Sequence, residues 1–431
     1  MNKFFNKDNI KAILKFTLML FGVVAIFFTG YFTHYFSLDK DLRSLQFFLT
    51  TYKKHYYYAD ESKNSLDILS EALLDNYSDY YTKEDYEAYR TSSNGSHIGF
   101  GFSLSRENDL FITRVVGNSP AYNAGIKENS KIVGYKLEGE NEFVTPTTTA
   151  QITDYLDVIT DQAVTFKIDY KGTISLFTLS KASYNESFVY YTDNTGSYHF
   201  IGGDELVLTK KQTPDFTINE KWAYIKLTSF SGGKEGTLGA VGQFDKVMQL
   251  FNNNDNTKLI IDLRSNGGGY MSVMCSLCRY LCNTENNGEF LCTTAIYKDG
   301  KKEEYKAKNN VYNNYGFEKI IFLANSGSAS ASEALMGAVL DYDKSSQSNI
   351  VKVVLEPSMI GEEIVYKSYG KGIMQTTFIN NLTGEAVKLT TAEIRWPLSN
   401  ICIHGKGLTP ILDNRIVENY TDNAITFAQT L

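Results

Sequence analysis

An uncharged apolar run near the N-terminus sets the first constraint on this chain. Phe16–Phe36, FTLMLFGVVAIFFTGYFTHYF, contains no Asp, Glu, Lys or Arg over 21 positions. A helix of this length spans the hydrocarbon core of a bilayer, which is about 30 Å thick. Four lysines precede the run and two aspartates follow it closely. The positive-inside bias therefore predicts a cytoplasmic N-terminus and an exported remainder.

The same run is also compatible with a secretory signal that is removed after export. Its C-terminal end shows no small-x-small cleavage site, so we expect it to stay in place as an anchor. Residues 1–15 then form a cytoplasmic tail and residues 16–36 a single transmembrane signal anchor. The predicted location is the cell membrane, with the bulk of the chain outside the cytoplasm.

Composition allows a large folded core and excludes some partners. The 431 residues are 43% hydrophobic and 21% charged, which is ordinary for globular proteins. The net charge is −7 and no Lys/Arg-rich block occurs, so we expect no nucleic-acid partner.

Three of five cysteines, at 275, 278 and 282, have the spacing of one helix face and are expected to be buried. A zinc site would need a fourth ligand and a turn, so no metal is predicted.

The hydrophobic pattern changes several times along the chain. Residues 38–91 carry apolar residues at helical spacing, and short β-type runs fill residues 96–181. Residues 182–220 are polar and rich in Tyr and Asn, and we interpret them as a β-hairpin insert. From residue 221 strands alternate with helices, which predicts an α/β domain with largely parallel pairing.

A turn, a short helix and a strand follow one another in GNSPAYNAGIKENSKIVGY, residues 117–135. With HIGFGFSL upstream, this stretch resembles a circularly permuted PDZ domain, although Asn129-Ser130 replaces the usual Gly-Asp. PDZ domains bind C-terminal peptides by strand addition, with backbone N–H groups receiving the carboxylate. A β-rich domain without a ligand is the alternative. The resemblance places the carboxylate loop at His97, Ile98, Gly99, Phe100 and Gly101.

The stretch IIDLRSNGGG, residues 260–269, joins an apolar strand to three glycines and a helix. Glycines at a helix N-terminus let backbone N–H groups approach a negative charge, as an oxyanion hole requires. A phosphate-binding loop has similar needs, but the Gly-Lys-Ser/Thr ending is missing.

Four serines crowd a second strand-to-helix turn in ANSGSASASEALMGAVLDY, residues 324–342. Serine at a helix N-terminus commonly caps N–H groups, but a nucleophile also benefits from that position. A serine nucleophile needs a base, and His404 is a candidate that the sequence leaves open. Lys371, between two glycines in YGKGIMQ, is the other. Burial in an apolar pocket would lower its pKa and make it a usable base.

Taken in order, these motifs resemble the carboxy-terminal processing proteases of peptidase family S41, which use a Ser–Lys dyad. The family order of a helical segment, a PDZ domain, DLRxNxGG, GSASASE, GKGxxQ and KLTTA…GKGxxP is matched through residue 410. The resemblance implies that Ser330 is the nucleophile, Lys371 its general base and Gln375 the residue that orients the lysine. It implies oxyanion donors at the N–H of Ala331 and of Gly268 or Gly269.

The resemblance also implies a fold and a function. We expect a helical region at 38–93, a PDZ domain at 94–182 and a crotonase-like α/β peptidase domain at 183–431. The substrates would be proteins or peptides with free C-termini, and the reaction would need no metal or cofactor. Whether the chain forms a homo-oligomer is left open by the sequence.

Two departures from the family pattern bear on activity. Lys371 follows Ser330 by 41 positions, which is longer than the family's usual connection, and an insertion follows Gly361-Glu362. RSNGGG also lacks a proline often found before the last glycines. If the insertion displaced the lysine, the chain would instead be a catalytically inactive, membrane-tethered PDZ scaffold that binds C-terminal peptides.

Overall fold

The computed structural model describes most of the chain, in two units. The described residues are 7–37, 65–105, 110–192, 198–200, 216–219, 221–232, 238–253, 256–284, 287–360 and 363–431, with isolated positions between 39 and 51. The units are Met1–Asn76 and Tyr77–Leu431, and each is considered by itself.

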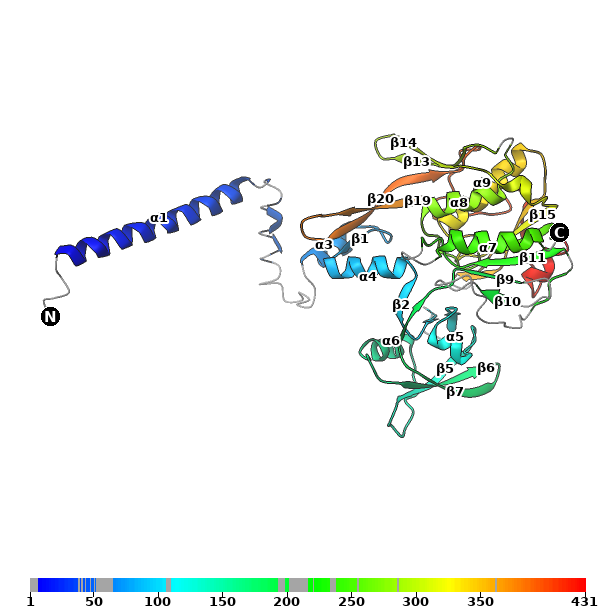
Figure 1. Cartoon of the computed structure of the whole chain (residues 1–431), viewed down its shortest axis with the longest axis horizontal. Helices are drawn as coiled ribbons and strands as arrows, with labels where there is room; N and C mark the ends of the chain where they lie inside the picture. The colour runs from blue at the N-terminus through cyan, green and yellow to red at the C-terminus, as the bar shows by residue number, and fades with distance from the viewer. Residues whose placement is uncertain are drawn as a thin grey trace. The chain divides into compact units, whose positions relative to one another are not determined.

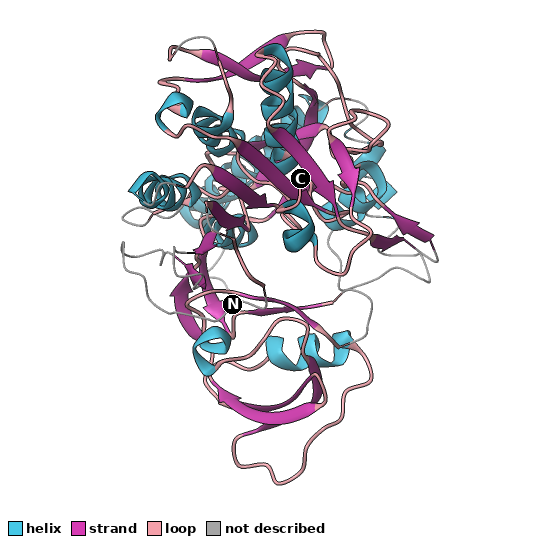
Figure 2. Ribbon diagram, turned by 90° about the vertical axis from the view of Figure 1, so that its right-hand side faces the viewer, coloured by secondary structure: helices cyan, strands magenta, loops and turns pink. Residues whose placement is uncertain are grey.

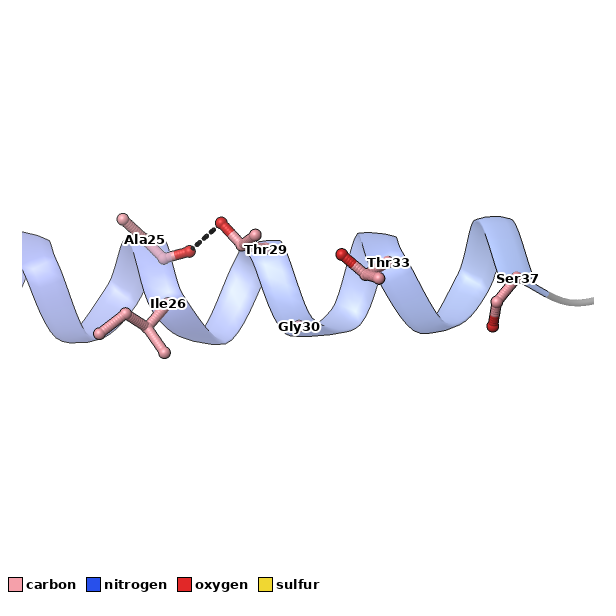
Figure 3. Close-up of a pocket in the computed structure, with 6 residues that line it drawn as sticks. All are labelled: Ala25, Ile26, Thr29, Gly30, Thr33 and Ser37. Carbon is pink, nitrogen blue, oxygen red and sulfur yellow. Dashed lines mark hydrogen bonds between the residues drawn. The ribbon is translucent and has the colours of Figure 1, made fainter.

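The first unit contains a long apolar helix, α1 (Lys7–Ser37). Its segment Ile13–Thr33 is long and apolar enough to cross a membrane, which a transmembrane anchor and a signal sequence both require. Small residues follow one face at intervals of four, from Ala25 through Thr29 and Thr33 (Figure 3), and Thr29 Oγ1 donates to the Ala25 carbonyl. The predicted apolar helix is confirmed. Of the helices expected over 38–91, the first unit shows α3 (Ser65–Leu73), and residues 52–64 lie outside the described part.

The second unit begins with β1 (Asp79–Tyr81), α4 (Lys83–Ser93) and a β-rich module with its own apolar core. The module's elements are β2 (Ser96–Gly99), β3 (Phe102–Leu104), β4 (Ile112–Val115), α5 (Pro120–Ala124), β5 (Lys131–Leu137), α6 (Thr149–Asp157), β6 (Val164–Tyr170), β7 (Thr173–Leu179) and β8 (Ala182–Asn185). Strand β2 pairs with β8, β3 with β4, and β5, β6 and β7 form one antiparallel sheet. Ile112, Ile132, Ile152 and Phe166 are fully buried at its centre. The β-type runs predicted between 96 and 181 are therefore strands.

A seven-stranded sheet organises the rest of the second unit (Figure 1). Its order is β10 (Tyr198–Phe200), β9 (Val189–Thr192), β11 (Trp222–Leu227), β12 (Lys258–Asp262), β15 (Lys319–Ala324), β16 (Val351–Leu355) and β21 (Ile416–Glu418). The five strands from β11 to β21 are parallel. This confirms the strand–helix alternation predicted from residue 221.

Helices cover both faces of this sheet (Figure 2). Side chains of α7 (Ala240–Asn253), α8 (Met271–Leu281) and α9 (Ala331–Ser345) share one apolar core with alternate residues of the strands. Short helix α10 (Ala424–Ala428) packs on the opposite face, against Tyr224, Ile260 and Ile321. Because parallel strands buried on both faces need apolar residues throughout, KLIID and KIIFLA are nearly continuous apolar runs.

A second sheet lies beside α8 and α9 and carries the segment that follows Lys371. It joins β1, β20 (Ala386–Arg395), β13 (Phe290–Tyr297) and β14 (Lys302–Ala307), and β19 (Ile373–Ile379) pairs with β20. The remaining elements are the short 3₁₀ helix Tyr312–Asn314 and the hairpin of β17 (Ser358–Ile360) and β18 (Glu363–Val365).

The cysteines lie where the helical spacing predicted. Cys275 and Cys278 are on α8 and Cys282 directly follows it, and all three are buried thiols. Burial raises the pKa of the Cys282 thiol, so it stays protonated and packs as a small apolar group. Cys292 is also buried, whereas Cys402 is partly exposed.

A buried carboxylate joins the β-rich module to the large sheet. Glu186 is 6% exposed; its Oε2 lies 2.9 Å from His97 Nε2, and its Oε1 pairs with the Arg114 guanidinium. Arg114 also donates to Thr228, which follows β11 (3.3 Å). Burial alone would raise the pKa of Glu186, but His97 and Arg114 outweigh it and hold that pKa below its usual value.

This lowered pKa predicts an acid-sensitive stability. A carboxyl whose folded pKa lies below its unfolded value stabilises the fold above that unfolded value, and the contribution is lost as the pH falls. We expect Glu186→Gln to lower the free energy of unfolding at pH 7 by about 1–3 kcal/mol and to flatten its pH dependence below about pH 5. Urea unfolding at several pH values measures this. Glu138→Gln, an exposed carboxylate in the same module, is the control, and equal slopes for Glu186→Gln and wild type would contradict the prediction.

Candidate active site

Ser330 occupies a strained turn between β15 and α9. Its backbone has φ +57° and ψ −117°, and Ala331 begins the helix directly after it. A non-glycine residue in such a conformation costs on the order of 1–3 kcal/mol, and such strain clusters at functional sites. A strand–turn–helix of this kind presents its serine at a helix N-terminus, as nucleophile elbows do. Ser330 is partly exposed.

The neighbouring serines fasten this turn to other parts of the fold. Ser328 Oγ donates to the Leu263 carbonyl (2.8 Å), and Ser332 Oγ donates to the Asn266 carbonyl (2.9 Å). Ser328 and Ser332 are fully buried. These contacts hold the serine turn against the end of β12, whereas Ser326 and Ser330 are partly exposed.

The glycine loop after β12 lies directly against Ser330. Gly268 has φ +100°, and a Cβ there would lie 2.8 Å from the Ala331 nitrogen and from the Ser330 Cβ. Gly269 has φ +143°, and a Cβ there would approach the Phe230 carbonyl oxygen to 2.5 Å. Both positions therefore require glycine, for backbone conformation and for space. The three predicted oxyanion positions, Gly268, Gly269 and Ala331, meet at one place.

Asn266 organises this loop; it is the Asn of the DLRxNxGG motif but was not among the predicted site residues. It is fully buried, its Nδ2 donates to the Leu227 carbonyl (2.8 Å), and its Oδ1 accepts from the Gly268 N–H (2.9 Å). Its carbonyl accepts from Ala329 N (3.0 Å). The Gly268 N–H is therefore engaged by a side chain, which favours Gly269 between the two predicted donors.

Lys371 lies on a loop whose glycines permit backbone-to-backbone packing. A Cβ at Gly370 would lie 2.9 Å from the Gly407 nitrogen, and one at Gly372 would lie 2.6 Å from the His404 nitrogen. Lys371 is partly buried, and its Nζ lies 4.7 Å from the centre of the Tyr77 ring. The two GKG motifs, at 370–372 and 405–407, thus support each other.

One buried carboxylate joins the serine turn to the lysine loop. Glu333 Oε2 accepts from the backbone N–H of Ser330 (3.0 Å) and of Lys371 (2.9 Å). Its Oε1 accepts from Gly370 N (2.8 Å) and from the Ser368 hydroxyl. Because one oxygen serves both residues, their backbone nitrogens lie within about 6 Å of each other.

Burial raises the pKa of Glu333, although its four hydrogen bonds oppose that shift. Glu333 is not among the site residues predicted from the sequence. The signal was present in the Ser-x-x-Glu spacing of a helix capping box, which the structure contains at Ser330.

The predicted insertion before Lys371 includes β18, which pairs with β17; Gly361 and Glu362 lie outside the described residues. The hairpin does not displace the lysine loop from the serine turn, because the Tyr369 N–H donates to the Ser328 carbonyl (3.0 Å). The loop thus returns to the serine turn.

The other predicted site residues lie at the edge of this arrangement. Gln375, on β19, donates its side-chain amide to Thr390 Oγ1 on β20 (3.0 Å). His404 is exposed and its backbone lies against Gly372, so the alternative base is near the lysine loop.

The predicted tail-binding loop, His97–Gly101, enters the β-rich module at β2. His97 is paired with Glu186, Ile98 is 80% exposed and Phe100 is buried. The carbonyls of Phe100 and Gly101 accept from Ala121 N (2.9 Å) and Val116 N (2.8 Å), which fixes the loop to the start of α5. Gly99 has open space at its Cβ position, whereas Gly101 lies against Ser119.

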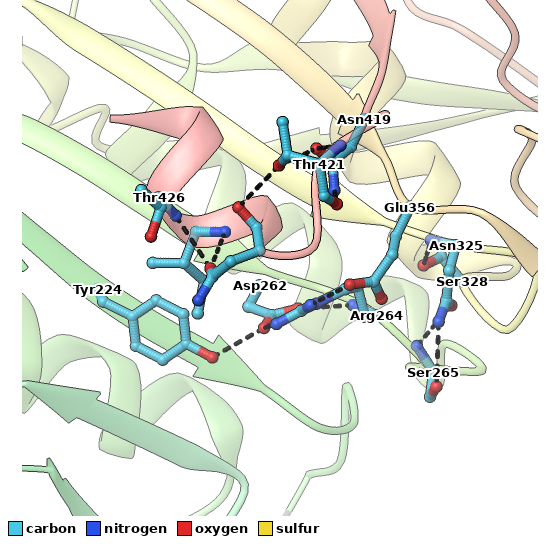
Figure 4. A network of polar contacts seen from close by, with 12 residues as sticks. Tyr224, Asp262, Arg264, Ser265, Asn325, Ser328, Glu356, Asn419, Thr421 and Thr426 are labelled. Atoms are coloured by element: carbon cyan, nitrogen blue, oxygen red, sulfur yellow. Dashed lines mark hydrogen bonds and ion pairs between the residues drawn. The ribbon is translucent and has the colours of Figure 1, made fainter. Parts of the chain in front are cut away.

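A charged network supports the strand end that carries the glycine loop (Figure 4). Arg264 donates to Asp262 and to Glu356 (2.7 Å), and the Tyr224 hydroxyl donates to Asp262 (2.7 Å). Burial alone would raise the pKa of Asp262, but Arg264 outweighs it and holds that pKa below its usual value. The network lines a cavity of about 660 Å³ that also reaches Arg114 and Glu128 of the β-rich module. Among the described residues, no group of three or more His, Cys, Asp and Glu side chains could hold a metal ion.

The shared carboxylate predicts a specific loss of activity. In Glu333→Gln, an amide N–H₂ replaces one acceptor oxygen and faces donors, so the serine turn and the lysine loop should separate. We expect hydrolysis to fall by at least about 100-fold. Asp341→Asn is the matched control, because Asp341 is a buried carboxylate on the same helix that accepts from Leu398 N and Ser399 N. Both variants should unfold at lower temperature, and equal hydrolysis by the two would contradict the assigned role of Glu333.

Comparison with known proteins agrees with this geometry. Residues 221–413 match the model of peptidase family S41. A CtpA-like serine protease of Staphylococcus saprophyticus is 26% identical over 429 residues, covering 96% of this chain and 74% of its own length. One from Staphylococcus epidermidis is 24% identical over 369 residues, covering 81% of this chain and 60% of its own length, so this chain spans less than two thirds of that relative.

A solved structure from Bacteroides fragilis, described as an S41 protease, has the same fold. Its TM-score is 0.50 at 13% identity, over 88% of this chain and 91% of that one. These findings identify residues 221–413 as a peptidase family S41 domain and the chain as a serine-type protease related to the CtpA-like proteins.

Proposed function

We propose that the chain is a membrane-anchored, extracytoplasmic serine endopeptidase that cleaves protein substrates near their C-termini. The observation that carries the proposal is the Glu333 carboxylate, which accepts from the backbone of both Ser330 and Lys371. A nucleophile and a base from distant parts of the sequence must be held together, and this contact does so. Helix α1, with its 21-residue apolar segment, would provide the anchor.

The proposed chemistry is acyl transfer through a covalent intermediate. Ser330 Oγ attacks the scissile carbonyl carbon while its proton passes to the neutral amine of Lys371. The developing oxyanion accepts from the N–H of Ala331 and of Gly269 or Gly268. When the C–N bond breaks, Lys371 returns the proton to the leaving amine. Lys371 then takes a proton from water, which attacks the acyl-enzyme carbonyl. As the bond to Ser330 Oγ breaks, Lys371 returns that proton to Oγ and the new C-terminus is released.

The remaining predicted residues have supporting parts in the proposal. Gln375 would orient Lys371 from β19, next to Thr390. Residues 183–431 would form the crotonase-like peptidase domain, and residues 94–182 a PDZ domain whose loop at His97–Gly101 receives the substrate's terminal carboxylate. No metal or cofactor takes part in these steps.

Replacing the proposed base tests the dyad. Lys371→Ala removes the proton acceptor without creating a large cavity, so the fold should persist while hydrolysis of casein falls by about 100- to 10,000-fold. Lys406→Ala is the matched control, because Lys406 is an exposed lysine between two glycines of the supporting loop. Ser330→Ala sets the background rate. Retention of more than about a tenth of the wild-type rate by Lys371→Ala would refute the dyad, and loss in His404→Ala instead would indicate a histidine base. If the wild-type chain hydrolyses nothing but still binds C-terminal peptides, the result supports the alternative of a catalytically inactive PDZ scaffold.

Tail recognition can be tested apart from chemistry in the full chain with Ser330→Ala. We expect peptides with a free C-terminus to bind and C-terminally amidated peptides to bind at least about tenfold more weakly, because amidation removes the charge that the loop receives. Gly99→Val should weaken binding of the free acid, since it fills open space at the loop. Ser175→Val, at an exposed position of β7, is the control. Fluorescence anisotropy measures both effects, and equal affinity for the two peptide forms would remove the tail-reading role.

A further inference from the structure

The contacts of the Lys371 side chain differ in kind from those of its backbone. Glu333 and the paired glycine loops fix the backbone, but four side-chain torsions separate that backbone from Nζ. A base must be held within reach of the proton that it accepts, so something must restrict these torsions. The Tyr77 ring lies under the amine, with Nζ 4.7 Å from its centre, which is within the range of a cation–π contact.

Tyr77 is itself tied to the serine turn through Tyr369. The Tyr77 hydroxyl donates to the Tyr369 hydroxyl (3.0 Å), and the two rings meet edge to face at 78° with their centres 6.4 Å apart. The backbone N–H of Tyr369 in turn donates to the Ser328 carbonyl (3.0 Å), two residues before Ser330. An aromatic pair therefore connects the amine of Lys371 to the turn that holds the serine.

The chain segment that carries Tyr77 is fixed on the sheet that follows Lys371 (Figure 1). Strand β1 begins two residues later and pairs antiparallel with β20, with Asp79 opposite Lys388. Ser78 Oγ accepts from the backbone N–H of Thr390 (2.9 Å), the residue whose hydroxyl accepts from Gln375. Tyr77 thus has a defined position relative to Lys371, although 292 residues separate it from Tyr369 in the sequence.

We propose that Tyr77 is a positioning residue for the reaction, and that its ring holds the protonated amine of Lys371 in one place beside the serine turn. The ring attracts the ammonium far more than the neutral amine. Proton loss weakens the electrostatic part of the contact, and packing against the ring still limits where the neutral amine lies when it accepts the Ser330 proton. This inference rests on the proposed function, in which Lys371 is the base.

The test is the pH dependence of hydrolysis in three full-length variants. The wild-type rate should rise with pH as Lys371 loses its proton. In Tyr77→Leu the loss of the ring disfavours the ammonium, so the rise should move to lower pH by about 0.5–1 unit. The plateau kcat should also fall, because the neutral amine loses its packing against the ring. Tyr77→Phe keeps the ring and should keep the position of the rise. Tyr89→Leu is the matched control, because Tyr89 makes the same contact with Lys388 away from the serine (5.1 Å).

A second measurement keeps this inference separate from the proposed function. Competitive acetylation of the Ser330→Ala protein at a series of pH values, read by mass spectrometry, gives the protonation of Lys371 without any hydrolysis. The same shift in Tyr77→Leu, and its absence in Tyr89→Leu, are expected. An unchanged protonation curve in Tyr77→Leu overturns the inference, whether or not the protein proves to be a protease. If Tyr77→Leu fails to fold, Tyr77→Met, which keeps side-chain length without a ring, decides by the same readouts.

Discussion

The buried carboxylate of Glu333 is the interaction on which the arrangement of the site depends. It is fully buried and accepts four hydrogen bonds, two of them from the backbones of Ser330 and Lys371. Burial of a carboxylate is costly unless its oxygens are saturated with donors, and here the donors come from both loops at once. The cost of burying the charge therefore enforces the approach of two segments that are 41 residues apart. A neutral apolar residue at this position could pack, but it could not select the two N–H groups.

The site also requires that backbone segments pack closely against one another, and glycines allow this. Gly268 lies against Ser330, and Gly370 and Gly372 lie against the backbone of residues 404–407. In each case a Cβ would come within 3.0 Å of a backbone atom, so the contacts exist only without side chains. The glutamate sets which loops meet, and the glycines set how closely they meet. Strain at Ser330 is then supported by its surroundings, because the serines on either side are anchored to the end of β12.

Local patterns in the sequence predicted much of this architecture, because strand–helix alternation, apolar periodicity and glycine–serine turns act over short distances. The apolar N-terminal helix and the parallel sheet are present. The predicted serine, glycine and lysine loops lie together, while the catalytic roles of Ser330 and Lys371 stay predictions. Asn266 and Tyr77 were not predicted, since their importance arises from contacts with residues far along the chain. Strand β8, residues 182–185, pairs with β2, and nothing in its own pattern indicates a partner at 96–99. Long-range pairing and buried polar contacts are properties of the fold rather than of a window of sequence.

An aromatic ring against the amine of Lys371 suits what the amine must do. A carboxylate at the same place would hold Nζ more firmly, but it would also favour the ammonium strongly and leave little neutral base near neutral pH. A ring attracts the ammonium more weakly and has almost no preference for the neutral amine beyond packing. Glu333, the acidic group nearest in sequence to the serine, has both oxygens engaged by backbone and hydroxyl donors. The two roles are physically compatible. The Glu333 carboxylate positions the backbones of Ser330 and Lys371, and the uncharged Tyr77 ring positions the Lys371 amine, whose proton must be exchangeable.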